Sequence, residues 1–127
     1  MYSNEDVYEG SFENNEKSGQ GEYRFSTGDL YQGMFKKGKK HGSGKMFFAN
    51  GDKYDGVWQN GQKHGKGVYT WSNGDRYEGG FWLDKREGDG IIYYGSGGRY
   101  EGYWKNDKKE GEGVFFHEDR ATKIVND

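Results

Sequence analysis

The sequence predicts an all-β fold: a single-layer twisted antiparallel β-sheet built from tandem β-hairpin repeats, elongated like a solenoid. Three observations support this prediction. The sequence repeats every 23 residues, residue types alternate with a period of two inside each repeat, and turn sequences such as Asn-Gly recur at fixed places. We expect one domain spanning residues 1–127.

The repeat is marked by tyrosines that lie 23 residues apart: Tyr8, Tyr31, Tyr54, Tyr77 and Tyr100. A glycine follows each tyrosine by two positions, and a large aromatic residue follows that glycine by two more. The predicted repeats are 8–30, 31–53, 54–76, 77–99 and 100–122, and residues 123–127 are predicted to form a C-terminal tail. Each repeat is expected to be one hairpin, because Asn-Gly between alternating segments favours a tight turn.

The first half of each repeat, Tyr-x-Gly-x-Phe/Trp, places its tyrosine, glycine and aromatic residue on one face of a strand. The second half alternates in the same way, so that Gly65, Gly67, Tyr69 and Trp71 share a face. Glycine normally weakens a strand. We interpret these glycines as clearance that lets the rings lie over bare backbone and stack along the array. The opposite face carries polar residues and is expected to be solvated.

The composition fits this interpretation, with 24 Gly, 11 Tyr, 8 Phe and 4 Trp among 127 residues and a net charge of −2. The absence of cysteine excludes disulfides and cysteine-based zinc sites. The N-terminus has no basic region followed by an apolar run, so no signal peptide is predicted. No segment reaches the roughly 18 apolar residues of a membrane span. We expect a cytoplasmic protein.

The segments Tyr54-Asp55-Gly56-Val57-Trp58, His64-Gly65-Lys66-Gly67 and Asn73-Gly74-Asp75 resemble the MORN repeat (membrane occupation and recognition nexus). The resemblance covers residues 8–122. It implies an elongated single-layer sheet and a role as a scaffold or interaction module. Members of this family occur in ciliary and cytoskeletal assemblies, in membrane-junction proteins and beside catalytic domains. Some members hold an extended or helical partner segment in their groove.

No residue pattern predicts an enzyme, a cofactor or a metal site. His41 and His64 occupy equivalent positions two strands apart, about 9–10 Å between backbones. Two histidines that share one zinc must bring their nitrogens within about 4 Å, so a turn-stabilising role is predicted instead. Asp29, Asp52 and Asp75 are expected to accept hydrogen bonds from their own turns. No phosphate-binding glycine motif is present.

The aromatic face is the predicted binding site for a protein partner, either an amphipathic helix or an extended peptide. The alternative is that the rings satisfy one another and leave a shallow groove without a ligand. The candidate anchors are Phe35, Trp58, Phe81 and Trp104 in first strands, and Phe48, Trp71 and Tyr94 in second strands.

A basic cluster at one hairpin turn offers a second possible contact, with an acidic partner or with anionic, phosphoinositide-type lipids: Lys36, Lys37, Lys39 and Lys40. A solvated turn that discourages edge aggregation is the alternative. Nucleic acid is not expected, because basic and acidic residues are interleaved. The sheet edges near Tyr8 and Phe115–Phe116 are predicted to be open, which would permit edge-to-edge self-association.

Overall fold

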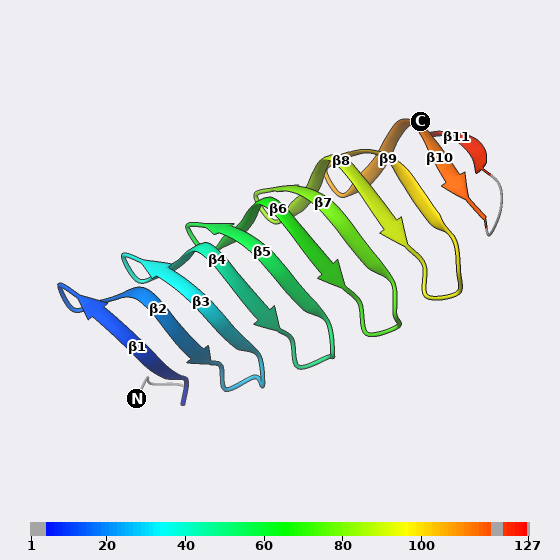
Figure 1. The fold of residues 1–127 in the computed structure, drawn as a ribbon. Coiled ribbons are helices and arrows are strands. Elements are labelled where there is room, and N and C mark those ends of the chain that lie inside the picture. The colour runs from blue at the N-terminus through cyan, green and yellow to red at the C-terminus, as the bar shows by residue number, and fades with distance from the viewer. Residues whose placement is uncertain (1–4, 118–120, 127) are drawn as a thin grey trace.

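The computed structural model describes residues 5–117 and 121–126, which form one open antiparallel sheet of 11 strands in chain order (Figure 1). The strands are β1 Val7–Glu13, β2 Glu16–Arg24, β3 Leu30–Lys36, β4 Lys39–Phe47, β5 Lys53–Gln59, β6 Gln62–Thr70, β7 Arg76–Trp82, β8 Lys85–Tyr93, β9 Arg99–Lys105, β10 Lys108–Phe116 and β11 Ala121–Asn126. The described residues contain no helix, and hence none that could span a membrane. The predicted fold class, a single sheet of sequential hairpins, is confirmed.

A row of glycines crosses ten neighbouring strands, because each glycine is the register partner of the next. The row runs through Gly10, Gly21, Gly33, Gly44, Gly56, Gly67, Gly79, Gly90, Gly102 and Gly113. The tyrosine side chains lie over this row. A Cβ atom added to Gly44 would overlap the Tyr31 ring, and one added to Gly67 would overlap the Tyr54 ring. The interpretation of these glycines as clearance for the rings is therefore correct.

The tyrosines of the repeat form the centre of the core. Tyr31, Tyr54 and Tyr77 are fully buried. Their hydroxyl groups donate to the backbone carbonyl three residues later, as Tyr54 does to Val57 at 3.0 Å. A buried phenol needs such an acceptor, because an unpaired hydroxyl would lose its hydrogen bond to water. Each tyrosine is thereby held against the backbone of its own strand.

The rings of successive repeats touch edge to face. Tyr31 and Trp58 have centroids 5.5 Å apart at 89°, and Tyr54 contacts both Trp58 (5.0 Å, 86°) and Phe81 (5.1 Å, 87°). The expectation of a stack along the array was wrong in this respect. Each tyrosine lies over the glycine row, nearly perpendicular to the neighbouring aromatic rings, and the ring quadrupoles favour this arrangement.

The two glycines of each Gly-x-Gly pair have different roles. The first has positive φ, 91° at Gly42 and 103° at Gly65, where the pairing within the hairpin shifts register. Only glycine adopts this conformation readily, and it produces a bulge in the strand. The second glycine lies beneath the tyrosine. Clearance for the tyrosine ring therefore explains only the second glycine of each pair.

The turn aspartates connect successive repeats. The Oδ1 atoms of Asp29, Asp52 and Asp75 accept hydrogen bonds at 2.8 Å from backbone amides about 20 residues later, in the turn of the next repeat. The prediction that they accept from the backbone of their own turns was wrong. Within those turns, Asp52 and Asp75 accept from the side-chain amides of Asn50 and Asn73, at 3.5 and 3.4 Å. Asn50 supplies the local acceptor, for the amide of Asp52 at 2.9 Å, which leaves the Asp52 carboxylate available to the neighbouring repeat.

The last described strand was not predicted. β11 pairs with β10 along its length, from Gly111 with Asn126 to Phe116 with Ala121. The predicted open edge at Phe115–Phe116 is therefore covered, and the outer strands are β1 and β11. Residues 123–126 of the predicted tail belong to this strand, and Ile124 packs against the core cluster. Asp127 lies outside the described residues.

Candidate functional site

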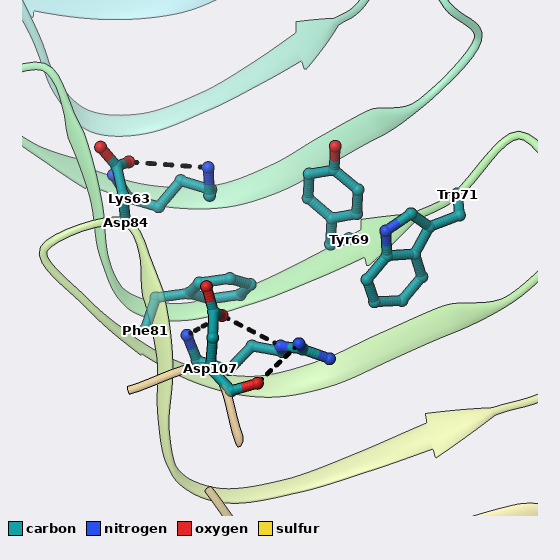
Figure 2. Close-up of a pocket in the computed structure, with 7 residues that line it drawn as sticks. Lys63, Tyr69, Trp71, Phe81, Asp84 and Asp107 are labelled. Carbon is teal, nitrogen blue, oxygen red and sulfur yellow. Dashed lines mark hydrogen bonds and ion pairs between the residues drawn. The ribbon is translucent and has the colours of Figure 1, made fainter. Parts of the chain in front are cut away.

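Two pockets lie along the aromatic face of the sheet. The N-terminal pocket has a volume of about 230 Å³ and is lined by Lys17, Tyr23, Phe25, Tyr31, Phe35, Gly38, Lys39, Lys40 and Gly61. The C-terminal pocket has a volume of about 220 Å³ and is lined by Lys63, Tyr69, Trp71, Phe81, Asp84, Arg86 and Asp107 (Figure 2). Both combine aromatic rings with basic side chains, and we call the surface that contains them the aromatic groove.

The two pockets are copies of one site. Every residue that lines the C-terminal pocket lies two repeats after a residue that lines the N-terminal pocket, as Lys63 follows Lys17 and Trp71 follows Phe25. Two repeats comprise four strands, which places the pockets about 19 Å apart along the sheet. The groove therefore presents the same arrangement of side chains at regular intervals.

A column of basic residues follows the groove with the period of the repeat: Lys17, Lys40, Lys63, Arg86 and Lys109. Each is the cross-strand partner of a first-strand ring, as Lys40 is of Phe35 and Arg86 is of Phe81. Their charged groups lie over the rings. Lys40 Nζ is 5.2 Å from the Trp58 centroid, and Arg86 Cζ is 4.6 Å from that of Trp104. Such cation–π contacts contribute roughly 0.5–2 kcal/mol each.

Sequence reasoning missed this basic column. Its signal was present, because the five positions are 23 residues apart and alternate in phase with the Gly-x-Gly glycines of the same strands. The column consists of single residues 23 positions apart, whereas Lys36, Lys37, Lys39 and Lys40 are nearly contiguous in the sequence. The periodicity that identified the aromatic column would have identified the basic one.

The predicted anchors divide into two groups. Phe35, Trp58, Phe81 and Trp104 are between 2% and 6% exposed and form the floor of the groove. Phe48, Trp71 and Tyr94 are partly buried and pack against that floor. The surface available to a partner therefore comes mainly from the second-strand rings, and the structure brings all seven residues to one face.

The family follows from this repeated geometry and from the sequence. The family model of the MORN repeat matches residues 8–30, 31–53, 54–76, 77–99 and 100–120. This chain belongs to the MORN-repeat family. No curated protein matches the chain in sequence.

In this MORN array, the predicted cluster of four lysines does not form one patch. Three of the lysines, Lys36, Lys37 and Lys39, are exposed around the turn between β3 and β4. Lys36 and Lys39 lie opposite each other on the two strands of that hairpin. Lys40 instead extends into the groove. Burial lowers the pKa of Lys40, the positive charges of Lys63 and Lys17 add to this effect, and Asp84 opposes it.

The two pockets of the MORN array differ in charge. In the C-terminal pocket, Asp84 forms an ion pair with Lys63 (Figure 2), and the two charged groups are 3.6 Å apart. Asp107 forms an ion pair with Arg86 at 3.1 Å. Each carboxylate also accepts a hydrogen bond at 2.8 Å from a backbone amide: Asp84 from that of Lys63, and Asp107 from that of Arg86. The equivalent residues in the N-terminal pocket are Gly38 and Gly61. The same fold thus presents one neutralised and one cationic pocket.

The histidine position of the repeat supports the neighbouring hairpin. His64 Nδ1 accepts a hydrogen bond from the Leu83 amide at 3.4 Å, and its ring packs on Trp82 at 4.3 Å. Glu87, one repeat later, accepts from the Asn106 amide at 3.2 Å. Across residues 5–117 and 121–126, no three His, Cys, Asp or Glu side chains are grouped to hold a metal ion. His64 thus has the turn-stabilising role that its position in the repeat predicts.

Proposed function

We propose that this MORN-repeat protein is a non-enzymatic scaffold or adaptor that binds a protein partner through the aromatic groove, within a cytoplasmic assembly of the cytoskeletal or ciliary type. One observation carries the proposal: two equivalent pockets of aromatic and basic residues lie along one continuous sheet. Repeated subsites of this kind suit a partner segment that runs along the array.

The dimensions of the groove fit a single segment. The pockets are about 19 Å apart, a distance covered by about six residues of extended chain or about 13 residues of helix. Aromatic and arginine side chains are the residues that most often dominate protein interfaces. The half-buried rings of Phe48, Trp71 and Tyr94 would be the main contacts.

The ionisable groups of the groove support a binding role. Asp84 and Asp107 are held in ion pairs and accept backbone amides. The residues that line the C-terminal pocket include no serine or histidine that these carboxylates could activate. The one lining tyrosine, Tyr69, donates its hydroxyl hydrogen to Asp52. These groups therefore serve charge balance and turn geometry.

The test compares groove variants with a matched surface variant. Phe48→Ala combined with Trp71→Ala removes two half-buried rings, whereas Trp82→Ala removes a ring that is 57% exposed and does not line either pocket. Trp58 is unsuitable, because it is only 3% exposed and belongs to the core. Partners captured by the wild-type protein should be lost from the double variant and retained by Trp82→Ala.

Thermal denaturation would establish that each variant is folded before its partners are compared. If the folded double variant keeps every partner of the wild-type protein, the groove is not the binding surface and the proposal fails.

A further inference from the structure

We propose that the N-terminal pocket binds a carboxylate side chain of an acidic partner segment, whereas the C-terminal pocket, whose cations already have acidic partners, receives an uncharged apolar side chain. The groove would thereby fix the direction in which a partner lies along the array. This inference rests on the proposed function and specifies the chemistry of the partner.

The central group of the N-terminal pocket is the Lys40 ammonium. It lies 5.7 Å from the centroids of both Phe25 and Tyr31 and 5.2 Å from that of Trp58. Within the described part of the chain, no carboxylate lies within ion-pair distance of Lys40. Lys17 and Lys39 line the same pocket. The pocket thus holds a partly desolvated positive charge beside apolar rings.

The C-terminal pocket shows which group is missing. There, one carboxylate oxygen of Asp84 accepts the Lys63 amide at 2.8 Å and lies 3.6 Å from the Lys63 ammonium. Asp107 does the same for the amide and guanidinium of Arg86. Lys40 has Gly61 at the corresponding position, which has no side chain to offer. An external carboxylate could take the place that Asp84 and Asp107 occupy beside their own cations.

The space at Gly61 is open. A Cβ atom built on Gly61 meets nothing within 4 Å, whereas one built on Gly38 would lie 3.7 Å from a Glu16 oxygen. The space beside Lys40 is therefore accessible. Asp84 and Asp107 have φ values of 71° and 69°, close to the 85° of Gly61, so a carboxylate fits the local backbone at this turn.

The surroundings favour a carboxylate on a peptide over a lipid headgroup. Phe25, Phe35 and Tyr23 enclose the charge with apolar surface that would contact the rest of a side chain. Three lysines line the pocket, Lys17, Lys39 and Lys40, so positive charge alone would also suit a phosphate. The apolar rings beside Lys40 are what favour a carboxylate on a peptide. One carboxylate beside an apolar residue matches this pocket.

The experiment uses the whole chain and two synthetic peptides, one of alternating Glu and Leu and one with Gln in place of Glu. Binding is followed by the NMR signal of the Trp58 indole N–H, whose ring contacts Lys40. The Glu peptide should bind about tenfold or more tightly than the Gln peptide, because charge-assisted hydrogen bonds are the stronger ones.

Two variants reverse the difference between the pockets. Gly61→Asp supplies Lys40 with an internal acid and should weaken the Glu peptide about tenfold, whereas Asp84→Gly should create a second site for it beside Lys63. Gln59→Glu is the matched control, since it adds the same charge on an exposed position of β5 that lines neither pocket. It should leave the affinity within about twofold.

Equal affinity for the two peptides, or an unchanged affinity in Gly61→Asp, would overturn the inference.

Inorganic phosphate and phosphatidylcholine vesicles with and without a phosphoinositide serve as further probes. Displacement of the Glu peptide by phosphoinositide vesicles but not by plain ones would assign the pocket to lipid and also overturn the inference. The two proposals can fail separately. If the Phe48→Ala, Trp71→Ala double variant loses its natural partners but the wild-type protein binds the two peptides equally, the proposed function holds and the inference about the pocket is wrong.

Discussion

The N-terminal and C-terminal pockets are two copies of one site, and they differ chiefly at two turn positions. Gly38 and Gly61 in the first copy correspond to Asp84 and Asp107 in the second. The strands, the buried tyrosines and the basic column are common to both. The comparison shows that this repeat keeps its packing in the strands and varies its charge in the turns, where a substitution leaves the core unchanged.

The largest effect should come from the packing that the two regions share. Tyr31→Ala and Tyr77→Ala each remove a fully buried ring with two edge-to-face neighbours. We expect each to lower the free energy of unfolding by about 3–5 kcal/mol, by similar amounts in the two regions, as measured by urea denaturation. A loss confined to one of them would show that the two copies are not packed alike.

A smaller loss should follow from filling the space beneath these rings. Gly44→Ala and Gly90→Ala place a methyl group where the Tyr31 and Tyr77 rings lie, so the rings or the strands must shift. We expect a cost of about 1–3 kcal/mol in each case. Ser43→Ala, at the exposed neighbour of Gly44, should change stability by less than about 0.5 kcal/mol. If Gly44→Ala is equally mild, the ring does not need the bare backbone.

Alkaline pH should distinguish the tyrosines of the two regions. Burial raises the pKa of Tyr77 to about 12, with Arg86 opposing the rise, and burial also raises the pKa of Tyr31. Because unfolded tyrosines ionise near pH 10, this stabilisation is complete below pH 10 and is lost as the pH rises through about 12. Each tyrosine should contribute about 1.4 kcal/mol per pH unit to the loss.

Phenolate absorbance in Tyr31→Phe and Tyr77→Phe would assign the two ionisations. We expect Tyr77 to ionise before Tyr31, since the Arg86 guanidinium stabilises its phenolate. Ionisation of both near pH 10 in a folded protein would contradict their burial.

The smallest effect should come from the charges that distinguish the pockets. Asp84→Gly removes the ion pair with Lys63 and the hydrogen bond to its amide, and should cost about 0.5–1 kcal/mol because the carboxylate is half exposed. Gly61→Asp adds the equivalent ion pair but places a side chain at a φ of 85°, so it should gain less than Asp84→Gly loses. Both differences should shrink at high salt, as measured by denaturation at two ionic strengths. Asp84→Asn, which can keep the amide contact without the charge, separates the two contributions.

Much of the fold could be predicted from the sequence, because the repeat places strand residues in phase with the pleat. The tyrosine, glycine and aromatic positions, such as Tyr54, Gly56 and Trp58, fall on one face by alternation alone. The edge-to-face contact of Tyr54 with Phe81 could not be predicted in this way. It depends on how far each ring tilts over the glycine row, which is a property of three neighbouring strands.

Most of the failures involve contacts between repeats. The Asp52 carboxylate has a plausible acceptor role in its own turn, and only the three-dimensional spacing shows that the Ser72 amide is its partner. β11 lacks the glycines and tyrosine of the repeat, so periodicity gave no sign of it. The candidate site was predicted as an aromatic surface. Its charge pattern was missed because the matching residues, Lys40 and Gly61, belong to different repeats.

Most hydrogen bonds between the turns of neighbouring repeats run in one direction along the array; the exceptions are those donated by Lys63 and Arg86, including their backbone amides, to Asp84 and Asp107 of the next repeat. In the others, the acceptor belongs to the earlier repeat and the donor amide to the later one, as with Asp52 and Ser72 at one edge of the sheet and Lys40 and Gly61 at the other. A ribosome releases the earlier repeat first. Each finished hairpin therefore presents acceptors before their donors have been synthesised, and we expect the array to grow by successive docking from its N-terminal end. The direction of these bonds matches the direction of translation.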